Sequence, residues 1–102
     1  MSKELLLVVD AVAAEKGVPE AVIFEAIEAA LASAAKKRYP EEDVLVRVSI
    51  DPKTGNYETF RRWEVVADDV VMESPDRQLR LMDAVDESEG AEVGDYVEEQ
   101  IE

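Results

Sequence analysis

Carboxylates are the only abundant reactive side chains in this sequence. The 102 residues include 25 Asp and Glu against 11 Lys and Arg, for a formal net charge of −14, and they contain no His and no Cys. This composition excludes a Ser-His-Asp triad, a histidine general base, a disulfide and a zinc site with Cys or His ligands. Neighbouring carboxylates are expected by chance at this density, and none stands out as a general acid–base pair. The sequence therefore predicts no catalytic residue.

Motifs for metals and cofactors are also weak. The acidic stretch 86–90 is faintly similar to a calcium-binding loop. The glycine of such a loop follows the fifth position, whereas Gly90 occupies the fifth position itself. The four glycines of the chain form no phosphate-binding loop. We expect no metal, no cofactor and no small-molecule substrate.

Lys36, Lys37 and Arg38 form the only run of three basic residues. Cations at the end of a helix complement its dipole, so helix termination is one interpretation. The other is a small patch that faces phosphates at the tip of a helix. The net charge of −14 argues against broad contact with nucleic acid or an anionic membrane by this chain alone.

Residues 51–63 read as a turn followed by a strand rich in aromatic residues and arginine. The proline and glycine within 52–55 suit a four-residue hairpin loop. Apolar residues alternate before the loop and predict a partner strand at 44–50. The length of the loop fixes a register in which Ile50 faces Tyr57.

This register gives the hairpin two different faces, because residues opposite each other share a face. We assign one face to the core; it carries Val48, Ile50, Tyr57 and Trp63. The other face carries Leu45, Arg47, Phe60 and Arg62. An exposed surface of aromatic and arginine side chains is typical of a site for a protein partner. The alternative is that another element of the same chain covers this face.

Arg61 conflicts with this division, because the register places its charge on the core face. Either Arg61 lies at the margin of the sheet beside a carboxylate, or a bulge at 61–62 redirects its side chain. The sequence leaves both possibilities open.

Two amphipathic helices precede the hairpin. The spacing of apolar residues predicts a first helix from Lys3 to Lys16, and Gly17 stops it. Pro19 suits the first position of a second helix, which runs to about Arg38 and is roughly 30 Å long.

After the hairpin, the pattern predicts a short strand at about 77–81, a short helix around 82–85 and a last strand at about 95–101. Two helices followed mainly by strands favour an α+β fold. We expect two N-terminal helices packed on a small, mainly antiparallel four-stranded sheet. With 47 % hydrophobic residues, the chain is expected to fold as a single domain over residues 1–102.

The N-terminal apolar run, 5–9, is too short for a signal peptide or a membrane span. A cytoplasmic location fits this feature.

Three stretches of the chain carry a likeness to a known family. The first comprises SKELLLVVDAV, EKGVP and IFEAIEAALASAAKKRY, the second VRVSID and TGNYETFRRWEVV, and the third GDYVEEQIE. In this order they resemble the N-terminal domain of the bacterial transcription factor NusA over nearly the whole chain. The combination of two features is the most specific: the FRRW signature at 60–63 and the Ala-rich helix that ends in the basic run at 36–38.

The resemblance implies a function. In that family the domain binds bacterial RNA polymerase near the RNA exit channel, at the tip of the β-subunit flap. There it promotes pausing and hairpin-dependent termination and takes part in antitermination. The chain is then no enzyme, and Lys36, Lys37 and Arg38 form an RNA-proximal basic patch. The nascent RNA hairpin lies nearby and is bound weakly, if at all, by this chain alone.

The resemblance also implies a domain organisation. The family's N-terminal domain has a globular head, with the four-stranded sheet and two helices, and a helical body, followed by S1 and KH RNA-binding domains. Residues 1–102 are expected to be the head alone. Two alternatives from other classes are an acidic metal-binding fragment of a cytoplasmic enzyme and a structural oligomerisation domain.

Overall fold

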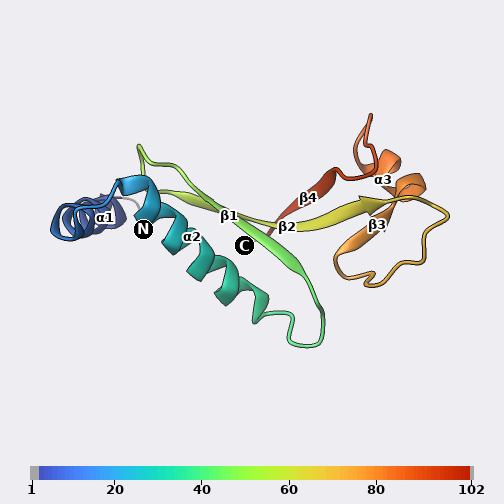
Figure 1. The fold of residues 1–102 in the computed structure, drawn as a ribbon, viewed down its shortest axis with the longest axis horizontal. Helices are drawn as coiled ribbons and strands as arrows, with labels where there is room; N and C mark the ends of the chain where they lie inside the picture. The colour runs from blue at the N-terminus through green and yellow to red at the C-terminus, as the bar shows by residue number, and fades with distance from the viewer. Residues whose placement is uncertain (1–2, 102) are drawn as a thin grey trace.

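The computed structural model describes residues 3–101 and arranges them around one long central strand (Figure 1). The elements in chain order are α1 (Lys3–Lys16), α2 (Glu20–Lys36), β1 (Leu45–Ile50), β2 (Tyr57–Val66), β3 (Gln78–Arg80), α3 (Leu81–Glu87) and β4 (Tyr96–Ile101). The four strands form one sheet, in which β1 and β4 pair antiparallel with β2, and β3 pairs parallel with it. The predicted α+β fold with a mainly antiparallel four-stranded sheet is confirmed.

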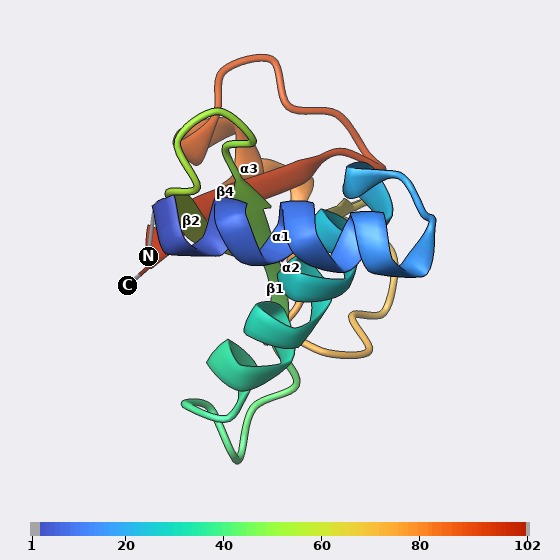
Figure 2. The same cartoon turned by 90° about the vertical axis from the view of Figure 1, so that its left-hand side faces the viewer.

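Strand β2 joins the two ends of an elongated molecule that measures 52 × 30 × 23 Å (Figure 1). At one end α1 packs on α2, which packs on β1; at the other end α3 packs against β3 and β2. Figure 2 looks from the helical end, where α1 crosses in front of α2. Strand β1 pairs with residues 57–62 of β2, β4 with 59–64 and β3 with 64–66. Because β1 and β4 pair with the same stretch of β2, they lie on its opposite edges.

A glycine turn separates the two N-terminal helices, as predicted. Gly17 has a φ of 67°, in the left-handed region that favours glycine. The N–H group of Val18 then donates to the carbonyl of Ala13 at 3.1 Å, which closes the end of α1.

The second helix is shorter than expected. Pro19 is its N-cap rather than its first residue, and the helix has 17 residues and ends at Lys36. The N–H groups of the next three residues donate to carbonyls three positions back, at 3.0–3.2 Å. This tightening ends the regular helix two residues before Arg38. The helix is therefore about 26 Å long rather than 30 Å.

The β1–β2 hairpin has the predicted register, with Ile50 opposite Tyr57. Gly55 has a φ of 78°, and its N–H group donates to the carbonyl of Asp51 at 2.8 Å to close the loop. Pairing continues residue by residue as far as Leu45 and its partner Arg62. The bulge considered at 61–62 therefore does not occur in this hairpin.

The main core lies between the two N-terminal helices and β1. Its buried residues are Leu5 and Val9 of α1 and Val48 and Ile50 of β1. Partly buried side chains pack around them, almost all on one face of α2: Ile23, Phe24, Ile27, Leu31 and Ala32. Alternation on β1 and helical spacing on α2 thus produce one apolar layer.

Two residues expected in the core are less buried than predicted. Tyr57 is 42 % exposed, and Trp63 is only half-buried. The reason is that α2 packs on β1 and leaves the neighbouring strand less covered. Within the described residues, β4 pairs with β2 only from Thr59 onward, so Tyr57 is flanked by β1 alone.

A carboxylate of α2 protects the outer edge of β1. Oε2 of Glu28 accepts a hydrogen bond of 2.8 Å from the backbone N–H of Ile50, and the contact is partly buried. Exposed strand edges invite pairing with other chains, and a side-chain acceptor at this position satisfies one edge donor. The same bond fixes the position of α2 along the strand.

A second buried group lies at the other end of the molecule, where Val65 is 1 % exposed and Ala84 is fully buried. The loop that precedes β3 is tied to this end by Arg80, whose Nη1 donates to the carbonyl of Asp68 at 2.7 Å. No helix within residues 3–101 is both long and apolar enough to span a bilayer.

Candidate functional site

Alternate residues of three strands meet on the face of the sheet opposite to α2. The pairing places Leu45 opposite Arg62 and Arg47 opposite Phe60, and β4 adds Glu98 opposite Arg62. Residues at such positions share a face of the sheet. We call the resulting group the outer-face cluster: Leu45, Arg47, Phe60, Arg62, Tyr96 and Glu98. The structure thus brings together all four residues that the sequence predicts for a partner surface.

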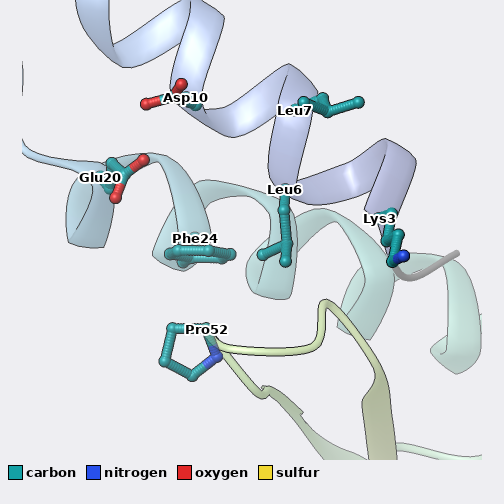
Figure 3. A pocket seen from close by; sticks show the side chains of 7 residues that line it. All are labelled: Lys3, Leu6, Leu7, Asp10, Glu20, Phe24 and Pro52. Atoms are coloured by element: carbon teal, nitrogen blue, oxygen red, sulfur yellow. The ribbon is translucent and has the colours of Figure 1, made fainter.

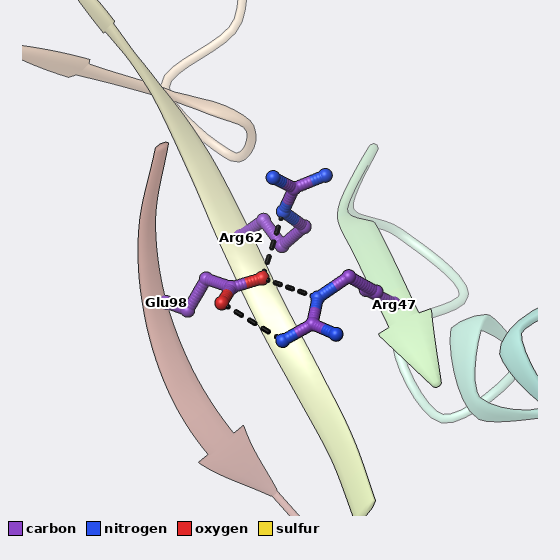
Figure 4. Close-up of polar contacts among 3 residues, drawn as sticks. All are labelled: Arg47, Arg62 and Glu98. Atoms are coloured by element: carbon purple, nitrogen blue, oxygen red, sulfur yellow. Dashed lines mark hydrogen bonds and ion pairs between the residues drawn. The ribbon is translucent and has the colours of Figure 1, made fainter. Parts of the chain in front are cut away.

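Glu98 lies at the centre of the cluster, between two arginines (Figure 4). Nε of Arg47 donates to Oε2 of Glu98 at 2.7 Å, and Nη2 of Arg47 donates to Oε1 at 3.0 Å. Nε of Arg62 lies 2.9 Å from Oε2. This N–H is not aligned for a hydrogen bond, so the second contact is an ion pair. Bidentate pairing fixes the plane of the Arg47 guanidinium as well as its position.

These contacts change the acidity of the carboxylate. The hydrogen bonds from Arg47 lower the pKa of Glu98 from its ordinary value of 4.5, partial burial opposes this effect, and the charge of Arg62 adds to it. The same hydrogen bonds raise the pKa of Arg47. Glu98 therefore stays ionised at neutral pH and holds both guanidinium groups in place.

Each arginine of the cluster also lies over an aromatic ring. The guanidinium carbon of Arg47 is 4.5 Å from the ring centre of Phe60, and that of Arg62 is 3.9 Å from the ring centre of Tyr96. Both distances are within the range of cation–π attraction. The two stacks and the shared carboxylate make the cluster a preorganised surface.

The cluster is accessible to a partner. The side chain of Arg47 is 40 % exposed, and Tyr96 is 44 % exposed. A polar hollow of about 440 Å³ adjoins Arg62 and is walled by the loop 88–95. Two arginines and one carboxylate leave one excess positive charge in a chain of net charge −14. Aromatic and arginine anchors of this kind suit protein recognition.

Lys36, Lys37 and Arg38, which we call the basic crown, lie at the C-terminal end of α2. All three are exposed, and none forms an ion pair within the described part of the chain. Because α2 covers the opposite face of the sheet, the crown and the outer-face cluster are not brought together. The crown remains open to either interpretation, a helix terminus or a phosphate-facing patch.

Arg61 lies beside a carboxylate, as in the first of its two possible arrangements, but not at the margin of the sheet, because it pairs with both β1 and β4. Its Nη2 lies 3.9 Å from Oε1 of Glu42 and donates to the carbonyl of Asp76 at 3.2 Å. Its guanidinium carbon lies 4.6 Å from the ring centre of Trp63 and 5.3 Å from that of Tyr39. The charge on the core face is thus held by a carboxylate, a backbone carbonyl and two nearby aromatic rings.

Sequence reasoning missed Glu98 and Tyr96 as members of the cluster. Both belong to a strand that the sequence predicts, but its pairing partner is not encoded locally. The available signal is their alternation, since Tyr96 and Glu98 are two residues apart and must share a face. Among residues 3–101, no group of three or more carboxylates is arranged to hold a metal ion.

Comparisons with known proteins match the chain to one family. Residues 4–102 match the family described as the NusA N-terminal domain. The chain is 38 % identical to the transcription termination/antitermination protein NusA of Bacillus subtilis (strain 168), over 96 % of this chain and 25 % of that protein. It is 31 % identical to the protein of that name from Rickettsia prowazekii (strain Madrid E), over 94 % of this chain and 18 % of that protein.

A solved structure shares the fold. The solution structure of the N-terminal domain of NusA from B. subtilis superposes with a TM-score of 0.74 at 34 % identity, covering 97 % of this chain and 77 % of that one. The chain therefore spans a quarter or less of the length of these full relatives and about three quarters of the solved domain.

Proposed function

Because the chain belongs to the family of NusA N-terminal domains, we propose that it is the RNA-polymerase-binding module of a transcription termination/antitermination factor. It acts in the cytoplasm, docks near the RNA exit channel at the tip of the β-subunit flap, and modulates pausing, hairpin-dependent termination and antitermination. Residues 1–102 form the head of this module as a single domain. The relatives are transcription factors and not enzymes, so the alternative of an enzyme fragment is wrong.

The outer-face cluster is the proposed docking surface on this head. The observation that supports it is the accessible pair of arginine–aromatic stacks around Glu98, at 4.5 and 3.9 Å. Such preorganised side chains lose little conformational freedom on binding. The remaining acidic surface steers the domain towards basic surface on the polymerase, and salt weakens this steering.

Phe60→Ala tests the docking surface. Its matched control is Tyr57→Ala, since Tyr57 is an exposed aromatic residue on the opposite face of the same strand. Binding to bacterial core polymerase is measured with and without the flap tip. Phe60→Ala is expected to weaken binding at least about tenfold, as for interface anchors, and Tyr57→Ala to leave it unchanged. Equal binding by both variants, or full binding without the flap tip, contradicts the proposal.

We propose that the basic crown lies near the emerging RNA rather than in the polymerase interface. Three consecutive residues fan around a helix end, so they can meet phosphates but not read bases. Lys36→Ala/Lys37→Ala/Arg38→Ala keeps helix propensity high. We expect polymerase binding to persist and the enhancement of hairpin pausing to fall, independent of RNA sequence.

The pausing assay uses a chimera in which this chain replaces the matching segment of the B. subtilis protein. Unchanged pausing would show that the crown is only a helix terminus. Loss of polymerase binding would place the crown in the protein interface. Light scattering of the chain alone tests the remaining alternative, an oligomerisation domain.

A further inference from the structure

A hollow lies on the inward face of the sheet, the face on which α2 packs, where β2, β3, β4 and the end of α3 meet. Its volume is about 280 Å³. We call it the Trp63 hollow, and its lining residues are Trp63, Leu79, Glu87, Val97, Glu98 and Glu99. It shares no residue with the apolar groove between α1, α2 and the hairpin loop, which Figure 3 shows from close by.

The hollow forms because the helices leave part of the inward face uncovered. Helix α2 packs mainly on β1, whereas α3 packs against β3 and β2. Trp63 of β2 is paired with Val97 of β4, and Leu79 of β3 is paired with Val65 on the same face. The side chains of Trp63, Leu79 and Val97 are only half-buried. The incomplete burial of Trp63 therefore coincides with an apolar wall that has open space beside it.

Two carboxylates border this wall without a cationic partner. Glu99 is the middle one of three inward-facing residues of β4, and the other two are apolar. Arg61 is its partner across the strands, but the guanidinium of Arg61 contacts Glu42 and the carbonyl of Asp76 instead. Within residues 3–101, neither Glu99 nor Glu87 takes part in an ion pair. The hollow thus combines an apolar wall with two unmatched negative charges.

We propose that the Trp63 hollow binds the side chain of an arginine or lysine from a partner protein. The apolar stem lies against Trp63, Leu79 and Val97, and the charged head lies between Glu87 and Glu99. Aromatic rings attract cations, and long basic side chains bury their stems on apolar surface while their heads stay in water. The net charge of −14 adds a general attraction for a basic segment and repels nucleic acid.

The size of the hollow suits one side chain rather than a whole ligand. Pockets for small molecules usually measure about 300–1,000 Å³, and this hollow is smaller. The chain itself shows that Trp63 accepts a guanidinium, since that of Arg61 lies 4.6 Å from the ring centre. Arg61 does not line the hollow, and Glu42 beside it offsets its charge. The hollow therefore offers room for a second cation.

A different role for Glu99 is to protect an edge strand. Within the described residues, β4 pairs with β2 alone, and inward-pointing charges on edge strands hinder pairing with other chains. This role needs neither the aromatic wall nor Glu87, and it predicts aggregation rather than weaker cation binding when Glu99 is neutralised. The proposal also stands apart from docking through the outer-face cluster, because the hollow opens on the other face of the sheet.

Trp63 is the only tryptophan of the chain, so its fluorescence reports directly on the hollow. The probe is a capped peptide of about five residues with one arginine among glycines and serines. Its control carries citrulline, which has nearly the same shape and no charge. The arginine peptide is expected to change the fluorescence saturably, with a Kd of about 1 mM for a single side chain, and to shift the amide signals of Leu79 and Val97. No saturable change, or an equal response to the citrulline peptide, overturns the proposal.

Substitutions at the rim test the two carboxylates. Glu87→Gln and Glu99→Gln are each expected to weaken binding about threefold, and the double variant about tenfold. Glu89→Gln is the matched control, because Glu89 is exposed, lies two residues from Glu87 and does not line the hollow. If Glu89→Gln weakens binding as much as Glu87→Gln, only net charge matters and the proposed site is wrong. Unchanged binding with increased aggregation of Glu99→Gln also overturns the proposal, in favour of edge protection.

A free diamine tests the source of the cation. Putrescine carries ammonium groups without a polypeptide, and it lacks the planar guanidinium that stacks on aromatic rings. It is therefore expected to bind more weakly than the arginine peptide. Tighter binding of putrescine, with the same dependence on Glu87 and Glu99, would assign the hollow to a small polyamine and overturn its assignment to a partner protein.

Discussion

The two faces of the β1–β2 hairpin use the same strands for opposite purposes. On one face, the apolar side chains of Val48 and Ile50 are buried against the helices. On the other face, the partly exposed Arg47 stacks on Phe60 and forms an ion pair with the carboxylate of Glu98. A strand alternates its side chains, so neighbouring residues can serve stability and recognition separately. Function can therefore be changed on this sheet without dismantling the core.

The largest expected effect comes from breaking the covered face. Ile50→Ala should lower the free energy of unfolding by about 2–5 kcal/mol, because it leaves a cavity between β1 and the helices. Chemical denaturation measures this loss. Ser49→Ala, on the other face of the same strand and exposed, should cost less than about 0.5 kcal/mol. Similar losses at both positions would remove the distinction between the faces.

A smaller loss is expected where α2 is fixed to the edge of β1. Glu28→Ala removes the acceptor for the N–H of Ile50 and should cost about 1–2 kcal/mol, the penalty of an unsatisfied, partly buried donor. The amide of Ile50 should also exchange faster with solvent. Glu28→Gln keeps an acceptor oxygen and should lose less, while Glu25→Ala, at an exposed position of the same helix, should be nearly neutral.

On the open face, stability and binding should separate. Phe60→Ala should cost only about 1 kcal/mol of stability, since the ring is half-buried and its stack with Arg47 contributes about 0.5–1 kcal/mol. Thermal denaturation of the Phe60→Ala variant measures the loss of stability, and the polymerase-binding assay measures the loss of affinity. A stability loss as large as that of Ile50→Ala would show that Phe60 belongs to a core and that the comparison of faces fails.

The smallest expected effect concerns Glu98 and depends on pH. Its folded pKa is lowered from 4.5, so the ion pairs stabilise the fold above that pH and lose this effect as the pH falls through the folded pKa. Glu98→Gln should cost at most about 1 kcal/mol at neutral pH. The difference from the unchanged protein should shrink as the pH falls below 4.5 and through the lowered pKa of Glu98. Glu99→Gln is the control, since Glu99 forms no ion pair within the described residues.

Local signals predicted the elements well. The four-residue loop determined the register of the hairpin, and therefore the shared face of Leu45, Arg47, Phe60 and Arg62, because alternation propagates from a single pairing. Gly17 ended α1 as predicted, since its positive φ suits the closing turn. These are consequences of neighbouring residues alone.

The sequence does not reveal which residues far apart along the chain come into contact in the fold. Tyr57 was assigned to the core from its face, but exposure depends on how far α2 and β4 extend over β2. Arg61 needed Glu42 and Asp76, which approach it only in the folded sheet. Glu98 joined the outer-face cluster for the same reason, because strand order is set by tertiary packing.

Strand β2 is hydrogen-bonded to each of the other three strands described between residues 3 and 101. The buried group around Val9 and the one around Val65 lie at different ends of the molecule, and each is small. Groups of this size rarely hold together alone. Because both depend on the same strand, loosening either end exposes the hydrogen bonds that the other requires. We therefore expect residues 3–101 to unfold as one cooperative unit, so that a destabilising change at the α1–α2 end also loosens the region of α3.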